Sequence, residues 1–296
     1  MNKFSVSNSA AAGCVHAGVD LIAPHFDAFI VDVWGVVCDG VSAFPAAVDA
    51  LRHLRAIGPV ALLSNTARRS HALARHLTGL GIDVDCYDVL LTAGEACHLA
   101  LKSGRWRAEG QTGDGGVLYI GPDRDRTILA QSGVQECRSL KEATAIVCTG
   151  MLETLNSVEA HDRLLVEWLK KDLPFICANP DRIVRIGAKT VPCAGALAER
   201  YQYLGGRVLQ FGKPEPAIYH ACINKLQQLR PSLTRARILA IGDGLETDIA
   251  GANRQGLNSV LVKTGIHGLQ ETEGLVERKY AGSPPVPDYV ATALDW

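Results

Sequence analysis

Long apolar runs are missing from this sequence. No stretch approaches the roughly 18 consecutive apolar residues that a membrane-spanning helix needs. The early Lys3 is not followed by the continuous apolar segment of a signal peptide. Internal repeats and low-complexity tracts are absent as well. We therefore expect a cytoplasmic protein with no membrane partner.

The sequence also has almost no net charge. Lys and Arg total 30, Asp and Glu total 31, and the formal net charge is -1. A chain of this kind has no broad attraction for nucleic acid or for an anionic membrane surface, so no nucleic-acid partner is expected. An anionic small molecule would have to be held by local donors.

Closely paired cysteines are missing too. The chain has nine cysteines, an odd number, and no two are spaced C-x-x-C. Several, including Cys148 and Cys177, lie inside strand-like apolar runs. Reduced thiols in the protein core explain this pattern better than disulfides or a zinc site do.

What the sequence does contain is an alternation of short apolar runs with helical patterns. With 296 residues, 47% of them hydrophobic, the chain is long enough for one large domain or two ordinary ones. The alternation predicts a parallel sheet covered by helices on both faces. Strands are expected at 28–33, 60–63, 238–241 and 259–262, and helices at 45–57, 70–80 and 247–255.

The middle of the chain repeats this theme with elements of its own. Strands are expected at 117–120, 145–148 and 175–178, and helices at 94–102, 123–131, 157–171 and 192–204. This is enough material for a separate small α/β domain. We expect it at 89–206, inserted between the two parts of a discontinuous core, 1–88 and 207–296, whose sheet would resume at 207–211.

Acidic residues follow two of the expected core strands. Asp32 ends the first apolar run, and Asp243 and Asp248 follow a run far downstream. Carboxyl ends of parallel strands meet at one edge of a sheet, which predicts a shared site. Because facing carboxylates repel each other, a cation between them is expected, and oxygen ligands suit Mg²⁺.

Other polar residues occupy corresponding positions. Ser64 and Asn65 follow the second strand, and Lys213 follows the insert. With Asp32, these groups suit phosphoryl transfer, which needs positioning and positive charge around the phosphoryl oxygens. The backbone of the turn at Gly35 is a further candidate phosphate cradle. Each residue alone has a plainer explanation, such as a helix cap or a surface lysine, so the functional interpretation depends on their co-occurrence.

These motifs resemble the haloacid dehalogenase superfamily, and most closely its NagD-like phosphatases (class IIA). The four family motifs are matched in order at 29–37, 62–65, 212–214 and 242–248, and a typical cap loop at 178–181. The resemblance implies a Rossmann-like core with an inserted, mobile α/β cap of the C2 type. It implies a hydrolase of small phosphate monoesters in which Asp32 becomes an aspartyl phosphate.

The predicted site joins residues from all of these motifs. We expect catalytic roles for Asp32, Ser64 and Lys213, and Mg²⁺ ligands at Asp32, Asp243, Asp248 and the backbone carbonyl of Trp34. We expect substrate contacts at Gly35, Asn65, Arg68, Asn179 and Asp181. For Arg68 an exposed helix start explains the sequence equally well, and Asn179 and Asp181 are also common turn residues.

Trp34 departs from the family pattern. Phosphatases of the superfamily usually carry a second Asp there, which protonates the leaving group and then activates water. Trp cannot move a proton, and a general acid or base is typically worth about 10²–10⁴-fold in rate. Asp39 and His267 are conceivable substitutes. Turnover of poor leaving groups should therefore suffer.

Two alternatives remain open at this point. Dehalogenases of the superfamily carry an aromatic Tyr at the position of Trp34 and use no metal, although such an enzyme has no evident need for Asp243 and Asp248. A phosphate-ligand binding protein with little catalysis is the second alternative. A homodimer is left open.

Overall fold

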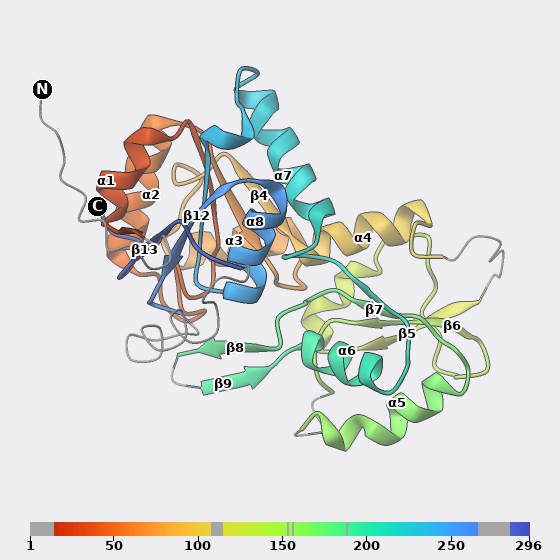
Figure 1. Ribbon diagram of the computed structural model, residues 1–296. Coiled ribbons are helices and arrows are strands. Elements are labelled where there is room, and N and C mark those ends of the chain that lie inside the picture. The colour runs from red at the N-terminus through yellow and green to blue at the C-terminus, as the bar shows by residue number, and fades with distance from the viewer. Residues whose placement is uncertain (1–14, 108–114, 153, 156, 188, 266–284) are drawn as a thin grey trace, which may run out of the picture.

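The structure, a computed structural model, describes residues 15–107, 115–152, 154–155, 157–187, 189–265 and 285–296. Two parallel sheets of different size, each with its own helices, dominate the described part of the chain (Figure 1). The predicted α/β class with a parallel-sheet core is confirmed.

The larger sheet has seven strands, all paired in parallel. Every residue of three central strands is buried, because helices cover both faces of the sheet. The continuous apolar runs of these strands place apolar side chains on both faces. In spatial order the strands are β1 (Val15–His16), β13 (Tyr289–Ala291), β12 (Asn258–Val262), β11 (Ile238–Gly242), β2 (Ala28–Val31), β3 (Val60–Ser64) and β4 (Val89–Thr92).

Separate hydrophobic clusters fill the two faces of this sheet. One face packs against α1 (Val19–Ile22), α2 (Pro45–Ile57) and α3 (Ser70–Gly79), and the other against α7 (Pro216–Leu229) and α8 (Ala250–Gln255). Helix α2 has the predicted bounds, since Pro at its first position needs no amide hydrogen there. A π-helical turn, Leu245–Ile249, replaces the start of the helix predicted at 247–255.

The smaller sheet has four parallel strands, in the order β10 (Val208–Gln210), β7 (Phe175–Cys177), β6 (Ala143–Cys148) and β5 (Gly116–Ile120). Its helices are α4 (Ala93–Ser103), α5 (Asp162–Leu169) and α6 (Ala194–Tyr203). Two helices predicted here are shorter than expected: 123–131 is a 3₁₀ helix, Asp123–Ile128, and 157–171 has a 3₁₀ turn, Glu159–His161, before α5.

Two strands cross the expected limits of the inserted domain. The larger sheet does not resume at 207–211: that prediction is wrong, because Val208 pairs with Phe175 in the smaller sheet. Strand β4 begins at Val89 but is the edge of the larger sheet. A run of three half-buried residues suits the edge of either sheet, so its partner cannot be deduced from its composition. The division of the chain into core and cap stays a proposal.

An antiparallel hairpin, β8 (Ile183–Ile186) and β9 (Lys189–Pro192), was not predicted. It extends away from the smaller sheet and runs beneath the larger one (Figure 1). At its tip the amide of Gly187 donates a hydrogen bond to the carbonyl of Asp39, 3.3 Å away. The hairpin therefore bridges the two lobes.

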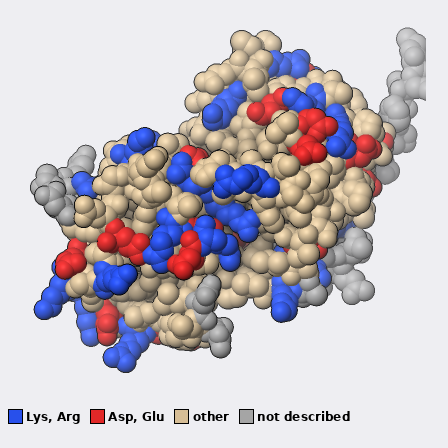
Figure 2. Space-filling view, turned by 180° about the vertical axis from the view of Figure 1, so that it is seen from behind, with Lys and Arg blue, Asp and Glu red and all other residues tan. Residues whose placement is uncertain are grey.

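The cysteines match the prediction of free thiols in the protein core, and the surface carries charges of both signs (Figure 2). On the face shown in Figure 2, basic side chains gather around the junction of the two lobes, and acidic side chains lie among and beside them. The cysteines of the described part are free thiols, and all but Cys137 are buried. In that part of the chain, no helix combines the length and apolar character needed to cross a bilayer.

Candidate active site

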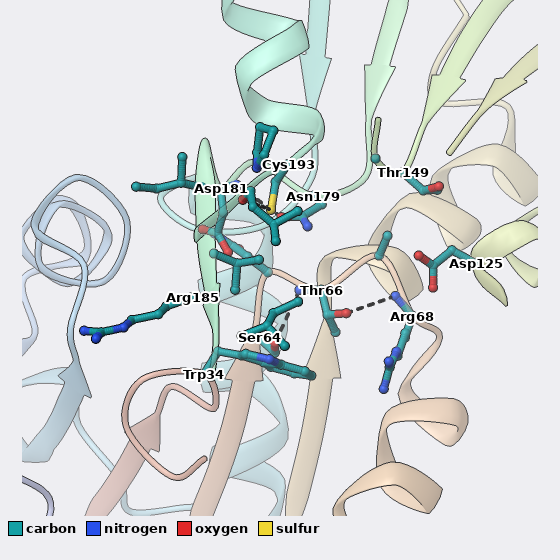
Figure 3. Close-up of a pocket in the computed structure, with 18 of the residues that line it drawn as sticks. Trp34, Ser64, Thr66, Arg68, Asp125, Thr149, Asn179, Asp181, Arg185 and Cys193 are labelled. Atoms are coloured by element: carbon teal, nitrogen blue, oxygen red, sulfur yellow. Dashed lines mark hydrogen bonds between the residues drawn. The ribbon is translucent and has the colours of Figure 1, made fainter. Parts of the chain in front are cut away.

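A cavity of about 400 Å³ opens between the two lobes, and residues of both line it (Figure 3). Every residue predicted for the site is among them: Asp32, Trp34, Gly35, Ser64, Asn65, Arg68, Asn179, Asp181, Lys213, Asp243 and Asp248. Residues separated by more than two hundred positions in the chain thus meet in one cavity.

Strand pairing explains how the acids meet. Strands β2 and β11 are direct neighbours, with Val31 opposite Ile241, so the residues that follow them emerge side by side. Asp32, Asp243 and Asp248 each offer a carboxylate oxygen within 4.8 Å of the other two, and all three residues are buried. Three oxygen donors at this spacing fit a divalent cation such as Mg²⁺.

The charges at this point are strongly coupled. Burial raises the pKa of Asp32 well above its ordinary value; Lys213 opposes that rise, while Asp248 and Asp243 add to it. Burial by itself would lower the pKa of Lys213, yet Asp248 and Asp32 raise it well above its usual range. Three buried carboxylates therefore lie together here, and the ammonium group of Lys213 pairs with two of them, Asp32 and Asp248. A divalent cation among them would stabilise the ionised forms.

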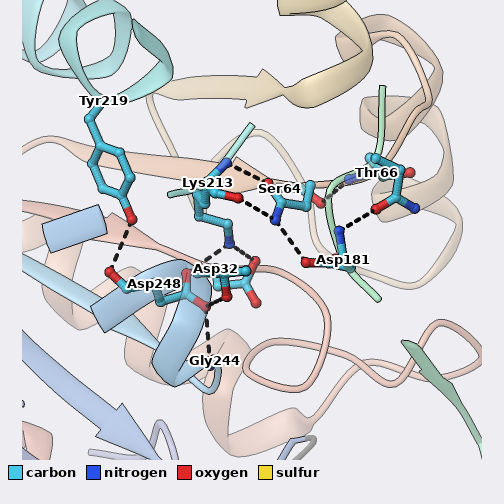
Figure 4. Close-up of polar contacts among 11 residues, drawn as sticks. Asp32, Ser64, Thr66, Asp181, Lys213, Tyr219, Gly244 and Asp248 are labelled. Carbon is cyan, nitrogen blue, oxygen red and sulfur yellow. Dashed lines mark hydrogen bonds and ion pairs between the residues drawn. The ribbon is translucent and has the colours of Figure 1, made fainter. Parts of the chain in front are cut away.

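Lys213 is held between two of the acids (Figure 4). Its ammonium group donates hydrogen bonds to Asp32 and, over 2.8 Å, to Asp248. Asp248 also accepts from the amide of Gly244 at 3.2 Å, and its own carbonyl accepts from the Tyr219 hydroxyl at 3.1 Å. These contacts fix the ammonium beside the carboxylate of Asp32.

Asn65 secures the segment that carries Lys213. Because β10 belongs to the smaller sheet, no strand pairing of the larger sheet positions this segment. The Asn65 side chain takes over: its oxygen accepts from the Lys213 amide at 2.7 Å and its nitrogen donates to the Lys213 carbonyl at 3.1 Å. The same nitrogen donates to Asp181 at 2.8 Å. Since both amide atoms are engaged, these contacts favour a positioning role, and substrate contact by Asn65 stays a prediction.

Two glycines surround the carboxylate of Asp243. A Cβ atom on Gly35, whose φ is +80°, would lie 2.4 Å from Asp243 Oδ2, and one on Gly265 would lie 1.6 Å from it. Any side chain at either position would displace the acid. The Gly35 amide donates to the Cys38 carbonyl at 2.8 Å within its own turn. The contribution of Gly35 that these contacts support is the close approach to Asp243 rather than a phosphate-binding amide.

Ser64 and Arg68 lie along the core side of the cavity. The Ser64 hydroxyl is buried and accepts from the amide of Thr66 at 3.3 Å. The Arg68 guanidinium lies 6.0 Å from the centre of the Trp34 ring. Both side chains line the cavity, with the guanidinium of Arg68 beside the indole of Trp34.

Asn179 and Asp181 approach the cavity from the lobe that contains the smaller sheet, just after β7. The Asp181 carboxylate accepts from Asn65, and the Asp181 amide donates to the Asn179 side chain at 3.2 Å. Burial raises the pKa of Asp181, and Lys213 lowers it. Asp181 thus connects the loop that follows β7 to the segment that carries Lys213.

Sequence reasoning missed several residues of the cavity wall, among them Arg124, Asp125, Thr149 and Arg185. Asp125 is only 5% exposed, although the run of charges from Asp123 to Arg126 looks like the solvated start of the helix predicted at 123–131. The one available signal was position, since Asp125 and Thr149 follow the carboxyl ends of neighbouring strands β5 and β6.

Comparison with known proteins identifies the family. A family model described as haloacid dehalogenase-like hydrolase matches residues 29–135, and a related one, HAD-hydrolase-like, matches 210–295. A crystal structure of a haloacid dehalogenase-like hydrolase from Brucella suis is 31% identical, covers 94% of this chain and 99% of its own, and has a TM-score of 0.82. The chain belongs to the haloacid dehalogenase-like hydrolase family.

Named relatives within the family are phosphatases. D-glycerol 3-phosphate phosphatase of Mycobacterium tuberculosis is 27% identical over 83% of this chain and 65% of its own length. A structure of a glycerol phosphate phosphatase from that bacterium, in complex with calcium, is 25% identical with a TM-score of 0.65 and covers 92% of this chain and 75% of its own. The ribonucleotide monophosphatase NagD of Escherichia coli K12 is 25% identical over 83% of this chain and 91% of its own. The prediction of a phosphatase-type hydrolase of the NagD-like class is confirmed.

Trp34 is the departure from the haloacid dehalogenase-like pattern. Its indole stacks on His76, with ring centres 6.1 Å apart and planes 10° apart, and packs against the core. Of the two conceivable substitute acids, Asp39 does not line the cavity. Its carboxylate accepts hydrogen bonds from the amides of Ser42 and Val41, and these bonds hold its pKa below the ordinary value. His267 lies outside the described residues.

Proposed function

We propose that this protein hydrolyses small phosphate monoesters with the help of Mg²⁺, through an aspartyl phosphate on Asp32. The observation that carries the proposal is the buried cluster of Asp32, Asp243 and Asp248, whose carboxylate oxygens lie within 4.8 Å of one another. The ammonium of Lys213 donates to two of these acids. This is a nucleophile, a metal-binding set and a fixed positive charge in one cavity.

The reaction would take place in two displacements at phosphorus. A carboxylate oxygen of Asp32 attacks the phosphorus, and the bond to the ester oxygen breaks with its electron pair leaving on that oxygen. Water then attacks the aspartyl phosphate, releasing phosphate and restoring Asp32. Ser64 would donate to one phosphoryl oxygen, and Lys213 would neutralise another.

The acid cluster fits a bound Mg²⁺ ion. Asp32, Asp243 and Asp248 would hold it, and the carbonyl of Trp34 is the further ligand expected from the family. When bound, the ion supplies positive charge that lowers the repulsion between an anionic nucleophile and an anionic ester. The structural support is the number, type and burial of the oxygen donors.

Trp34 limits which esters would react. With no carboxyl group at this position, the leaving oxygen receives no proton from it, and the phosphorus–oxygen bond breaks readily only when that oxygen is weakly basic. Aryl phosphates meet this condition, whereas ordinary alkyl phosphates do not. We propose a selectivity for aryl over alkyl esters of about 10²-fold or more, the lower end of what a general acid usually contributes.

The dehalogenase alternative is disfavoured by the same acid cluster. A metal-free displacement of halide needs one carboxylate nucleophile, and two further buried acids beside it would only raise its pKa. The relatives named above are phosphatases of glycerol phosphate and of ribonucleotides. For this chain we propose the shared feature, a small phosphate monoester as the substrate.

The test is a phosphate-release assay with 4-nitrophenyl phosphate. We expect turnover in Mg²⁺ and its loss with a chelator, followed by recovery on adding Mg²⁺ back. A matched assay with 2-haloacids follows halide release. Metal-independent halide release would replace the proposal with the dehalogenase alternative. Phosphate binding without any turnover would replace it with the binding-protein alternative.

A further inference from the structure

The cavity has a second polar region at its cap end, away from the acid cluster. It consists of Asp125, Arg124 and Thr149 from the cap and Arg68 from the core, and we call it the cap subsite (Figure 3). Arg68 connects the cap subsite with the acid-cluster end, since its guanidinium lies 6.0 Å from the Trp34 ring. A substrate with its phosphate near Asp32 would therefore place its leaving group along Trp34 and toward Asp125.

Asp125 brings to the cap subsite a buried oxygen that has no hydrogen-bond partner in the described part of the protein. Its side chain is buried, with 5% of the residue exposed, and Oδ1 has no hydrogen-bond partner in the described part of the protein. Its other oxygen lies 3.9 Å from Arg124 Nε, too far for a hydrogen bond. A buried carboxylate oxygen without a donor is costly, so a donor from the ligand would stabilise it.

The mixture of charges limits the ligand chemistry. A second phosphate or a carboxylate on the leaving group could accept from Arg68 and Arg124, but it has no hydrogen to donate to the unpartnered oxygen of Asp125. An ammonium group would be repelled by Arg68 and Arg124. Neutral hydroxyl groups suit both, since each can donate to a carboxylate and accept from a guanidinium. Thr149 adds a small buried hydroxyl, already bonded to Tyr119 at 2.7 Å, without further charge. The cap subsite therefore favours a neutral leaving group that carries several hydroxyls.

Trp34 adds a second, independent limit. It supplies no proton, so the leaving oxygen has to be weakly basic. Among the hydroxyls of a sugar, the anomeric one is the most acidic, because the ring oxygen bonded to the same carbon withdraws electrons. A sugar phosphorylated at its anomeric oxygen satisfies both limits at once.

We infer that the substrate is a sugar 1-phosphate whose hydroxyls are bound by Asp125 and Arg68, an inference that rests on the proposed function. Asp32 attacks phosphorus, the bond between phosphorus and the anomeric oxygen breaks, and the electron pair stays on that oxygen. The oxygen takes a proton from water, which yields the free sugar. Hydrolysis of the aspartyl phosphate by a second water yields phosphate.

The experiment compares matched hexose 1-phosphates and hexose 6-phosphates of glucose, mannose and galactose with the full-length protein in Mg²⁺. The two isomers carry the same number of hydroxyls and differ in the basicity of the leaving oxygen. We expect kcat/KM for at least one 1-phosphate to exceed that of its 6-phosphate by about tenfold or more. A 6-phosphate hydrolysed as fast as its 1-phosphate in every pair would overturn the inference.

Asp125→Asn tests the cap subsite itself. The variant keeps the shape of the side chain, and we expect kcat/KM for the preferred 1-phosphate to fall about tenfold, while that for 4-nitrophenyl phosphate stays unchanged. Arg68→Met should lower kcat/KM more for the preferred 1-phosphate than for 4-nitrophenyl phosphate, which gives a second readout if Asp125→Asn folds poorly. Asp123→Asn, on the same 3₁₀ helix but outside the cavity, is the matched control and should change neither rate.

The outcomes separate this inference from the proposed function. If Asp125→Asn lowers kcat/KM equally for the sugar and aryl esters, or for neither, the proposed cap subsite is wrong. The proposed phosphatase function would be unaffected by that result. Failure to hydrolyse even 4-nitrophenyl phosphate would remove both.

Discussion

The two ends of the cavity are built in different ways. At the acid-cluster end, polar groups have partners within the protein: Lys213 bonds to Asp32 and Asp248, and Asn65 bonds to the Lys213 backbone. At the cap end, Asp125 is buried with one oxygen that has no partner in the described part of the chain. Internal partners fix the geometry that every substrate of the family needs. The unpartnered oxygen of Asp125 can accept a hydrogen bond from a substrate, so it can distinguish substrates that donate one from those that do not.

The comparison predicts that changes at the acid-cluster end affect all esters. Asp243→Asn should have the largest effect, a loss of at least about 10³-fold in kcat/KM for every ester, since a neutral amide binds the ion poorly. The measurement is phosphate release at saturating Mg²⁺, with thermal melting to confirm that the fold is intact.

Glu246→Gln is the control for that change. Glu246 lies in the same turn, but its exposed side chain faces Arg182 at 3.8 Å and does not line the cavity. Its replacement should leave the rate and the Mg²⁺ dependence alone. Full activity in Asp243→Asn would show that the acid cluster is not the metal site.

Trp34→Asp should change selectivity rather than act on all esters equally. A carboxyl group at this position would protonate the leaving oxygen, so the gap between aryl and alkyl phosphates should narrow by about 10²-fold. Trp34→Asn removes the same indole, and with it the stacking on His76, without adding an acid. An equal narrowing in both variants would attribute the gap to the bulk of the indole.

Asp181→Asn should have the smallest effect, about a tenfold loss shared by aryl and alkyl esters. Asp181 contacts Asn65, which positions Lys213, so its loss should loosen the lysine for every substrate. The leaving-group series used for Trp34 measures this. A loss confined to alkyl esters would instead show that Asp181 supplies the proton that Trp34 cannot.

The acid-cluster end was predictable because it depends on a general property of parallel sheets. Residues that follow neighbouring strands meet at one edge, so Asp32 and Asp243 could be paired from their positions alone. The helix 45–57 was predictable to the residue, since Pro45 begins it and Gly58 follows it. In these cases the deciding interaction is local or follows from strand order.

The cap end was not predictable for the opposite reason. The pairing of Val208 with Phe175 and the burial of Asp125 depend on contacts between segments far apart in the chain. The hairpin of Ile183–Ile186 and Lys189–Pro192 is largely exposed, so it lacks a periodic apolar signal. Nothing in the local sequence distinguishes Asp125 from a solvated surface acid.

The central claim is that Asp32 carries the phosphoryl group during turnover. The direct measurement is mass spectrometry of the protein quenched in acid after brief reaction with 4-nitrophenyl phosphate and Mg²⁺, since an acyl phosphate survives acid better than base. We expect one added phosphoryl group, located on Asp32, lost on treatment with hydroxylamine, and absent from Asp32→Asn. Continued metal-dependent turnover by Asp32→Asn, or a phosphoryl group trapped on any other residue, would contradict the account.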